Sequence, residues 1–173
     1  CSASVQTACG EGYYNPKVNV QDASGCLACP LYATGPAAAI SVAQCTCING
    51  FIAAFENGVN ATESFECVCP PGTQRGTDEN GTVVCLSCLR GTYKASQGNQ
   101  LCTECKAGFT TFDEGGKSDL DCVCIEGRFL KYEGLRLDGG ELNYTNRVCD
   151  ECPNQGFECS EPGNALETLR LAP

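Results

Sequence analysis

Apolar positions along this chain come in short groups separated by polar and turn-forming residues. Thr82-Val83-Val84, Gly50-Phe51-Ile52 and Arg128-Phe129-Leu130 predict strands of two to four residues. Asn57-Gly58 and Asp138-Gly139 predict tight turns. Because the chain has no run of about 18 apolar residues, no segment of it is predicted to insert into a membrane.

A helical pattern occurs only at the C-terminal end. Asn164 with Glu167 three residues later resembles a capping box, and Leu166, Leu169 and Leu171 lie beside it. A single helical turn is not stable by itself. We therefore expect Leu166 and Leu169 to dock on a surface, which is either the last disulfide unit or a neighbouring module or subunit.

Cysteine sets the spacing of the rest of the chain, with 17 residues in 173. After Cys1 and Cys9 the cysteines form seven close couples, followed by Cys159. Cys9 and the second member of most couples are followed by x-x-Gly, which gives Gly12, Gly50, Gly72, Gly91, Gly108 and Gly127. We expect each glycine to form a tight turn with positive φ, followed by a short strand whose aromatic side chain covers the neighbouring disulfide.

The same pattern repeats at a longer period. Cys26 and Cys102 are 76 residues apart, and Cys45 and Cys122 are 77 apart. Self-similarity at a fixed period implies units that contact mainly their neighbours, and hence an elongated stack. The predicted organisation is a lead-in at 1–8, repeat copies at 9–87 and 88–159, and a tail at 160–173.

The spacing favours a ladder of disulfides in which the first cysteine of each couple bridges backward and the second bridges forward. Each bridge would contribute about 3 kcal/mol in the chain-entropy model, although crossed pairings within couples stay open. Cys1 is left over, and its partner is a cysteine upstream, a cysteine of another molecule, or none. The ladder pairs Cys9 with Cys26, Cys29 with Cys45, Cys47 with Cys67, Cys69 with Cys85, Cys88 with Cys102, Cys105 with Cys122, Cys124 with Cys149, and Cys152 with Cys159.

Composition explains why such cross-links are needed. Leu, Ile, Val and Phe make up only 34 of 173 residues, and the formal net charge is −10, which is close to the range of disordered chains. We therefore predict a small disulfide-rich fold, mostly β-hairpins and loops, with elongated tandem cysteine-rich repeats and little helix.

Two features predict an extracellular, secreted or cell-surface location. Cysteine-dense chains of this kind belong to oxidising compartments. Three sites also match the N-glycosylation pattern N-x-[ST], at Asn60, Asn80 and Asn143. We expect N-linked glycans as the covalent modification and no other cofactor.

Several chemistries are excluded or disfavoured. Without His there is no Ser-His-Asp triad and no His metal ligand, and with only 11 Lys and Arg there is no basic surface for nucleic acid. Zinc on Cys85, Cys88, Cys102 and Cys105 is disfavoured, because neighbouring Cys-x-Cys couples indicate disulfides. The acidic stretch 113–121 lacks the EF-hand pattern and predicts a solvated loop. We expect no enzyme and no metal site.

Residues 23–55 contain no charged side chain, although the chain carries 32 charges. Exposed apolar surface of this kind usually marks an interaction site, which makes Leu31, Tyr32, Ile40 and Val42 candidate interface residues. The alternatives are that the segment packs on its own copy's Tyr13, Tyr14 and Phe51, or that it is O-glycosylated or disordered.

The recurring C-x-x-C-x-x-G-x-[YF] and C-x-C-x-x-G-[FY] patterns resemble ephrin-receptor-like cysteine-rich repeats, which are related to EGF-like modules. The resemblance covers about 9–159 and implies a fold type more than a function. Cys29 departs from the pattern, because Pro-Leu-Tyr follows it with no glycine. The tail from Cys152 onward is similar to the segment after such repeats in large surface proteins of algae and other protists.

These observations together predict an extracellular structural glycoprotein. The first hypothesis is a disulfide-laddered rod that stacks on itself or on neighbouring modules in a surface filament or cell coat. The alternative is the stalk or ligand-binding ectodomain of a membrane receptor, with the uncharged segment as its ligand face.

Overall fold

The structure is a computed structural model and describes residues 9–17, 25–55, 64–136, 142–153, 157–164 and 170–171. Within these residues the chain forms strands, most of them short as the cysteine-rich pattern predicts, and 3-10 turns, which that pattern did not predict. The strands are β1 (Tyr13–Tyr14), β2 (Leu27–Ala28), β3 (Ala33–Thr34), β4 (Thr46–Cys47), β5 (Ile52–Ala54), β6 (Glu66–Val68), β7 (Thr73–Thr77), β8 (Val83–Ser87), β9 (Thr92–Tyr93), β10 (Thr103–Glu104), β11 (Phe109–Thr111), β12 (Cys122–Cys124), β13 (Arg128–Arg136), β14 (Leu142–Glu151), β15 (Phe157–Glu158) and β16 (Arg170–Leu171). The 3-10 turns are η2 (Val42–Gln44) and η4 (Asp119–Asp121).

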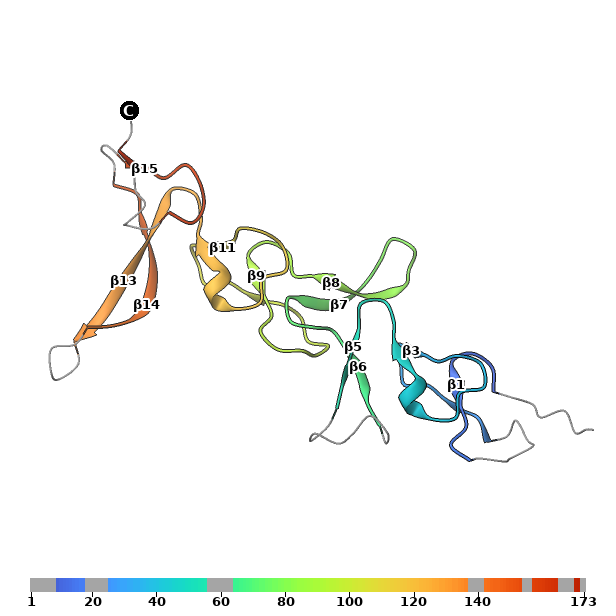
Figure 1. Cartoon of the computed structure of the whole chain (residues 1–173). Helices are drawn as coiled ribbons and strands as arrows, with labels where there is room; N and C mark the ends of the chain where they lie inside the picture. Colours follow the sequence, from blue (N-terminus) through green and yellow to red (C-terminus); the bar gives the residue numbers. More distant parts are fainter. Residues whose placement is uncertain are drawn as a thin grey trace, which may run out of the picture. The chain divides into compact units, whose positions relative to one another are not determined.

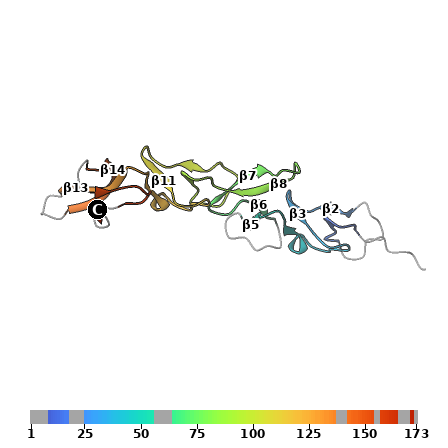
Figure 2. The ribbon, with the colours of Figure 1, turned by 90° about the horizontal axis from the view of Figure 1, so that it is seen from above.

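Every strand pairs with one neighbour in the chain, so the described residues contain eight two-stranded sheets and none wider. Figure 1 and Figure 2 show several of these two-stranded sheets from two directions. A two-stranded sheet has little stability in water unless something else holds it. The fold class is therefore the predicted one, disulfide-rich and built from hairpins and loops.

The chain divides into two compact units. The first consists of 1–70, 74–86 and 97–100, and the second of 71–73, 87–96 and 101–173.

The core of the first unit is small and rich in sulfur. Val42, Phe51 and Phe65 are buried together with Cys45, Cys67 and Cys69, and Tyr14 packs against this cluster from its edge. Phe51 follows the turn glycine Gly50, which is where an aromatic residue was expected to cover disulfides. Half of the buried cluster is therefore cystine.

In the second unit the buried positions are also largely cystines. Cys88 and Cys124 have no exposed surface, and Cys122, Cys149 and Phe129 are buried as well. The longest ribbon is β13–β14, which contains a register shift between Glu133 and Leu135. Near its base, Leu130 pairs with Cys149, so the cystine of Cys149 sits within the ribbon.

The duplication seen in the sequence has a structural counterpart inside each unit. Tyr14 forms an isolated parallel bridge with Ala39, and Tyr93 forms one with Gly116. In the same way η2 is capped by Ser41 and η4 by Ser118, 77 residues later. Equivalent positions of the two copies thus adopt equivalent backbone contacts. The copy boundaries themselves stay a prediction.

Three local predictions need correction. The strands were expected to be two to four residues long, but β7 and β8 have five residues each, β13 has nine and β14 has ten. The long ribbon is possible because the Cys124–Cys149 bridge closes its base.

The acidic stretch 113–121 is also not loop throughout, because it ends in η4, where Ser118 and Asp121 form a capping box. At the C-terminus Leu171 is not helical, since Arg170–Leu171 is strand β16, paired with Phe157–Glu158. The rest of the predicted helical turn, the turns at Asn57-Gly58 and Asp138-Gly139, and the lead-in 1–8 lie outside the described residues.

Candidate functional site

Eight disulfides join the cysteines from Cys9 to Cys159, with Cα–Cα distances from 5.5 to 6.2 Å. The pairs are Cys9–Cys26, Cys29–Cys45, Cys47–Cys67, Cys69–Cys85, Cys88–Cys102, Cys105–Cys122, Cys124–Cys149 and Cys152–Cys159. They are the pairs of the predicted ladder, and no couple is crossed. Cys1 lies outside the described residues. The first seven bridges each lie at one hairpin, from β1–β2 to β13–β14, and so supply the closure that two-stranded sheets lack. Cys152–Cys159 instead closes a short loop that contains β15 but not its partner β16.

The glycine after each x-x spacer forms the predicted turn. All six glycines of the motif have φ between 79 and 84°, a value that fits the third residue of a type II turn. At Gly50 the preceding Asn49 also has a positive φ, +57°, so that turn has the type I′ pattern. The turn is closed by a backbone bond such as Thr92 N–H to Leu89 O at 3.0 Å. Its glycine carbonyl then accepts a bond from the next couple, as Gly91 O does from Cys105 N–H at 2.8 Å.

Tyr32 occupies the place of this glycine after Cys29, in one of the two couples that lack it. Its φ is +64°, a left-handed conformation that disfavours any residue with a Cβ. The ring of Tyr32 stacks on Phe51 with centroids 4.4 Å apart and planes at 8°. Its carbonyl accepts from Ile48 N–H at 2.9 Å, which is the bond the glycine carbonyls make elsewhere. The aromatic stack thus offsets a strained backbone.

The candidate interface residues separate into two groups. Val42 is 5% exposed and Tyr32 is half-buried, so these two pack within their own copy, near Tyr14 and Phe51. Leu31 is 73% exposed and Ile40 is 63% exposed. Leu166 and Leu169 lie outside the described residues. Of the four candidates within the described residues, Leu31 and Ile40 are therefore the two that are largely exposed.

Two of the three predicted glycosylation sites lie within the described residues, at different places in their hairpins. Asn80 is exposed in the turn between β7 and β8. Asn143 lies in strand β14, where its backbone pairs with Leu135. Asn60 lies outside the described residues, in the connection between β5 and β6.

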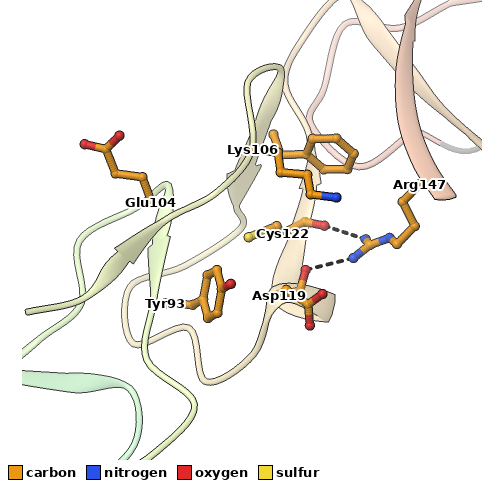
Figure 3. A pocket seen from close by; sticks show the side chains of 7 residues that line it. Tyr93, Glu104, Lys106, Asp119, Cys122 and Arg147 are labelled. Carbon is orange, nitrogen blue, oxygen red and sulfur yellow. Dashed lines mark hydrogen bonds between the residues drawn. The ribbon is translucent and has the colours of Figure 1, made fainter. Parts of the chain in front are cut away.

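A surface pocket in the second unit centres on Arg147 of β14. The Arg147 guanidinium donates to the carbonyl oxygens of Asp119 at 2.8 Å and Cys122 at 2.5 Å, as Figure 3 shows. It also lies 5.6 Å from the centroid of the Phe109 ring, within the range of a cation–π contact. These contacts tie strand β14 to η4 and β12. Arg147 is thus engaged in holding the backbone together.

Around Arg147 the pocket carries charges of both signs. Lys106 is a second cation, and Glu104 and Asp119 are carboxylates. This balance gives the pocket no preference for an anion or a cation. Sequence reasoning missed Arg147, because nothing in the spacing of residues 147 and 119–122 indicates that they meet.

Lys94 is another feature that the pattern did not indicate. It is buried at 3% exposure, and desolvation lowers the pKa of its amino group from the ordinary value. Its backbone N–H donates to Gly116 O at 3.0 Å, while its carbonyl accepts from Gly72 N–H at 2.9 Å. Lys94 therefore lies in the interior of the turn region of the second unit.

The cysteines considered as zinc ligands are all oxidised. Cys85 and Cys88 bridge to different partners, as do Cys102 and Cys105. Among the described residues no group of three or more Cys, Asp or Glu is placed to hold a metal ion. Over the same residues, no helix has the length and apolar character needed to cross a bilayer.

Comparison with known proteins identifies the central part of the chain. Residues 72–122 match the family model described as tyrosine-protein kinase ephrin type A/B receptor-like. These residues form an ephrin-receptor-like cysteine-rich segment. The resemblance read from the cysteine motifs is thereby confirmed for this part of the chain.

Two curated relatives support the same conclusion. Ephrin type-B receptor 2 of Gallus gallus is 43% identical over 63 residues, and that of Coturnix japonica is 41% identical over 63 residues. Each match covers 36% of this chain and 6% of the relative. The ephrin-receptor-like segment and the eight disulfides indicate an extracellular domain.

Among solved structures, a chain of the human RANKL/OPG complex is 21% identical and is matched over 67% of this chain and 79% of its own length. Its TM-score is 0.23. A likeness at that score supports no statement about fold or function.

Proposed function

We propose that this chain is part of the extracellular region of a membrane receptor, where it serves as a non-catalytic stalk or ligand-binding segment. The observation that carries the proposal is the match of residues 72–122 to the ephrin-receptor-like family, joined to an unbroken disulfide ladder on both sides of that match. The receptor alternative therefore takes precedence over the surface filament expected first. No comparison supports a filament.

The side chains that are present favour a structural or binding role over a catalytic one. The chain has no His, its cysteines from Cys9 onward are all in disulfides, and its central pocket uses Arg147 to bind backbone carbonyls. None of these groups is available as a nucleophile or general base. The absence of cofactors, nucleic acid and metal as partners remains part of the proposal.

Leu31 and Ile40 are the best candidates for contact with a partner, either a ligand or a neighbouring module. Both are large, apolar and more than half exposed, and they lie in the uncharged segment. Burying such side chains on binding would stabilise a complex by about 1.5–3 kcal/mol each.

The proposal is tested by immunolabelling cells that make the natural protein, with an antibody against residues 9–159. A receptor ectodomain predicts labelling of intact, unpermeabilised cells, together with a protein that extracts with the membrane fraction. Labelling that appears only after permeabilisation contradicts the proposal.

A second measurement separates the receptor from the filament. The secreted chain is followed by sedimentation velocity as its concentration rises, beside the double variant L31D/I40D and the control L101D, which changes a leucine that is 70% exposed. A receptor segment stays monomeric in all three. Growth of the parent chain into large particles, abolished by L31D/I40D and unaffected by L101D, would restore the filament.

A further inference from the structure

The tip of the β7–β8 hairpin is organised around Asp78. Its carboxylate Oδ1 accepts from the backbone N–H of Asn80 at 2.9 Å and of Thr82 at 2.8 Å. The Asp78 N–H also donates to Thr82 O at 2.9 Å, and Gly81 N–H donates to Asp78 O at 3.1 Å. One aspartate therefore holds the backbone of residues 78–82 in a fixed turn.

The side chains of Asn80 and Thr82 do not take part in holding this turn. Asn80 and Thr82 are both exposed, and their recorded hydrogen bonds involve only backbone atoms. Between them Gly81 has φ +79°, and a Cβ built on it would meet nothing within 4 Å. The amide of Asn80 and the hydroxyl of Thr82 thus face open solvent on a rigid turn.

We propose that Asn80 is N-glycosylated and that the folded hairpin tip presents the acceptor. The inference rests on the proposed extracellular function, because the modification occurs in the secretory pathway. In the reaction, Asn80 Nδ2 forms a bond to the anomeric carbon of the sugar and loses one proton. The bond from that carbon to the diphosphate of a lipid-linked oligosaccharide breaks, and the lipid diphosphate leaves.

Asn80 and Asn143 differ in the secondary structure that surrounds them. The backbone of Asn143 lies in the β13–β14 ladder, paired with Leu135. Asn80 instead lies outside any strand, in the exposed turn between β7 and β8, in a hairpin that Cys69–Cys85 bridges. Of the two sequons within the described residues, Asn80 is thus the one that the fold places in an exposed turn.

Occupancy is tested by glycopeptide mapping of the chain secreted from mammalian cells, for the parent, N80Q, T82S and T82V. Ser keeps the hydroxyl of the sequon, while Val matches the shape of Thr without it, and both keep the backbone bonds to Asp78. We expect the glycan on Asn80 in the parent and T82S, and its loss in N80Q and T82V. A secreted, fully oxidised parent with bare Asn80, or a T82V that still carries the glycan there, overturns the inference.

The role of the folded tip is tested on chain refolded without glycans and checked for its eight bridges. It is incubated with oligosaccharyltransferase and lipid-linked oligosaccharide. Transfer to Asn80 in the oxidised chain is expected, whereas transfer only after reduction contradicts presentation by the fold. Failure of the proposed function looks different, because a chain that stays reduced inside the cell fails before glycosylation is in question.

Discussion

At the scale of single residues, the third position after a cysteine decides whether the chain can turn back on itself. Six glycines fill that position with positive φ, and Tyr32 fills it once with the same conformation. A left-handed residue with a Cβ costs about 1–2 kcal/mol. The stack of Tyr32 on Phe51 recovers this cost through aromatic burial and contact, about 2–3 kcal/mol together.

The opposing effects of backbone strain and aromatic stacking at Tyr32 predict an order of stability for three variants. Y32F keeps the ring and should leave the free energy of unfolding unchanged. Y32G relieves the backbone but loses the stack, for a net loss of about 1 kcal/mol, and Y32A loses the stack while keeping the strain, for about 2–3 kcal/mol. Urea unfolding with disulfides intact measures the series. If Y32G proves more stable than Y32F, the stack does not offset the strain.

Gly127 and Gly10 form a matched pair for the turn conformation. Neither would bring a new Cβ within 4 Å of another atom, but only Gly127 has a positive φ, +79°. We therefore expect G127A to destabilise its unit by about 1–2 kcal/mol and G10A to change stability little. Hydrogen exchange at the amides of each turn provides the measurement. Equal effects of both substitutions would contradict the conformational explanation.

At the scale of elements, each hairpin is too small to persist by itself, and the seven from β1–β2 to β13–β14 each have one disulfide and a few contacts to hold them. Arg147 provides such contacts for β13–β14, through bonds to the carbonyls of Asp119 and Cys122 and contact with Phe109. On the same ribbon Lys131 and Asp150 form an exposed ion pair at 3.5 Å. Pairs of that kind contribute little.

Substitution of Arg147 and of Lys131 should therefore change the free energy of unfolding by different amounts. R147A should lower the free energy of unfolding by about 2 kcal/mol, since it removes charged hydrogen bonds and a cation–π contact. K131A should change it by less than about 0.5 kcal/mol. Chemical denaturation monitored by circular dichroism compares them. If R147A lowers the free energy of unfolding as little as K131A does, the contacts of Arg147 do not stabilise the fold.

The lengths of the bridged loops predict a second difference between elements. Cys124–Cys149 closes 25 residues and Cys152–Cys159 closes 7. The chain-entropy model gives about 3.5 kcal/mol for the longer loop and about 2.4 kcal/mol for the shorter one. The paired variants C124S/C149S and C152S/C159S, compared by thermal unfolding, should follow that order. The reverse order would show that bridge contacts outweigh loop entropy.

At the scale of the whole molecule, covalent links replace the interior that an ordinary domain would have. Among the described residues, cystines make up four of the nine buried hydrophobic positions in the first unit and five of the six in the second, and the described sheets are all two-stranded. Few apolar side chains remain to hold the chain if the sulfurs separate. Stability should therefore depend on redox state far more than on temperature or salt.

Reduction gives the corresponding prediction. Excess thiol reductant without denaturant should abolish the β circular dichroism signal and the protection of amides in both units. A metal chelator used as control should change neither, because the ladder cysteines carry no free thiolate. A chain that keeps its amide protection under strong reductant would contradict the account of both units.

Much of this architecture could be predicted from the order of residues, because its rules are local. The spacing of cysteines and glycines predicted the hairpins and the turn conformation, and it favoured the observed pairing of the bridges while leaving crossed pairings within couples open. Strand length could not be read in this way. β13 and β14 extend to nine and ten residues because their length depends on cross-strand pairing, which composition does not encode.

The sequence by itself determined the disulfide-rich fold class, the turns and the ephrin-receptor-like character of the central segment, since these depend on residue types at fixed short spacings. Only the tertiary structure decided which apolar residues of the uncharged segment are buried, that Tyr32 replaces a glycine by stacking on Phe51, and that Arg147 clamps carbonyls more than 20 residues away. Those outcomes depend on which side chains meet in space. Contacts between distant positions leave no periodic signal in a single sequence.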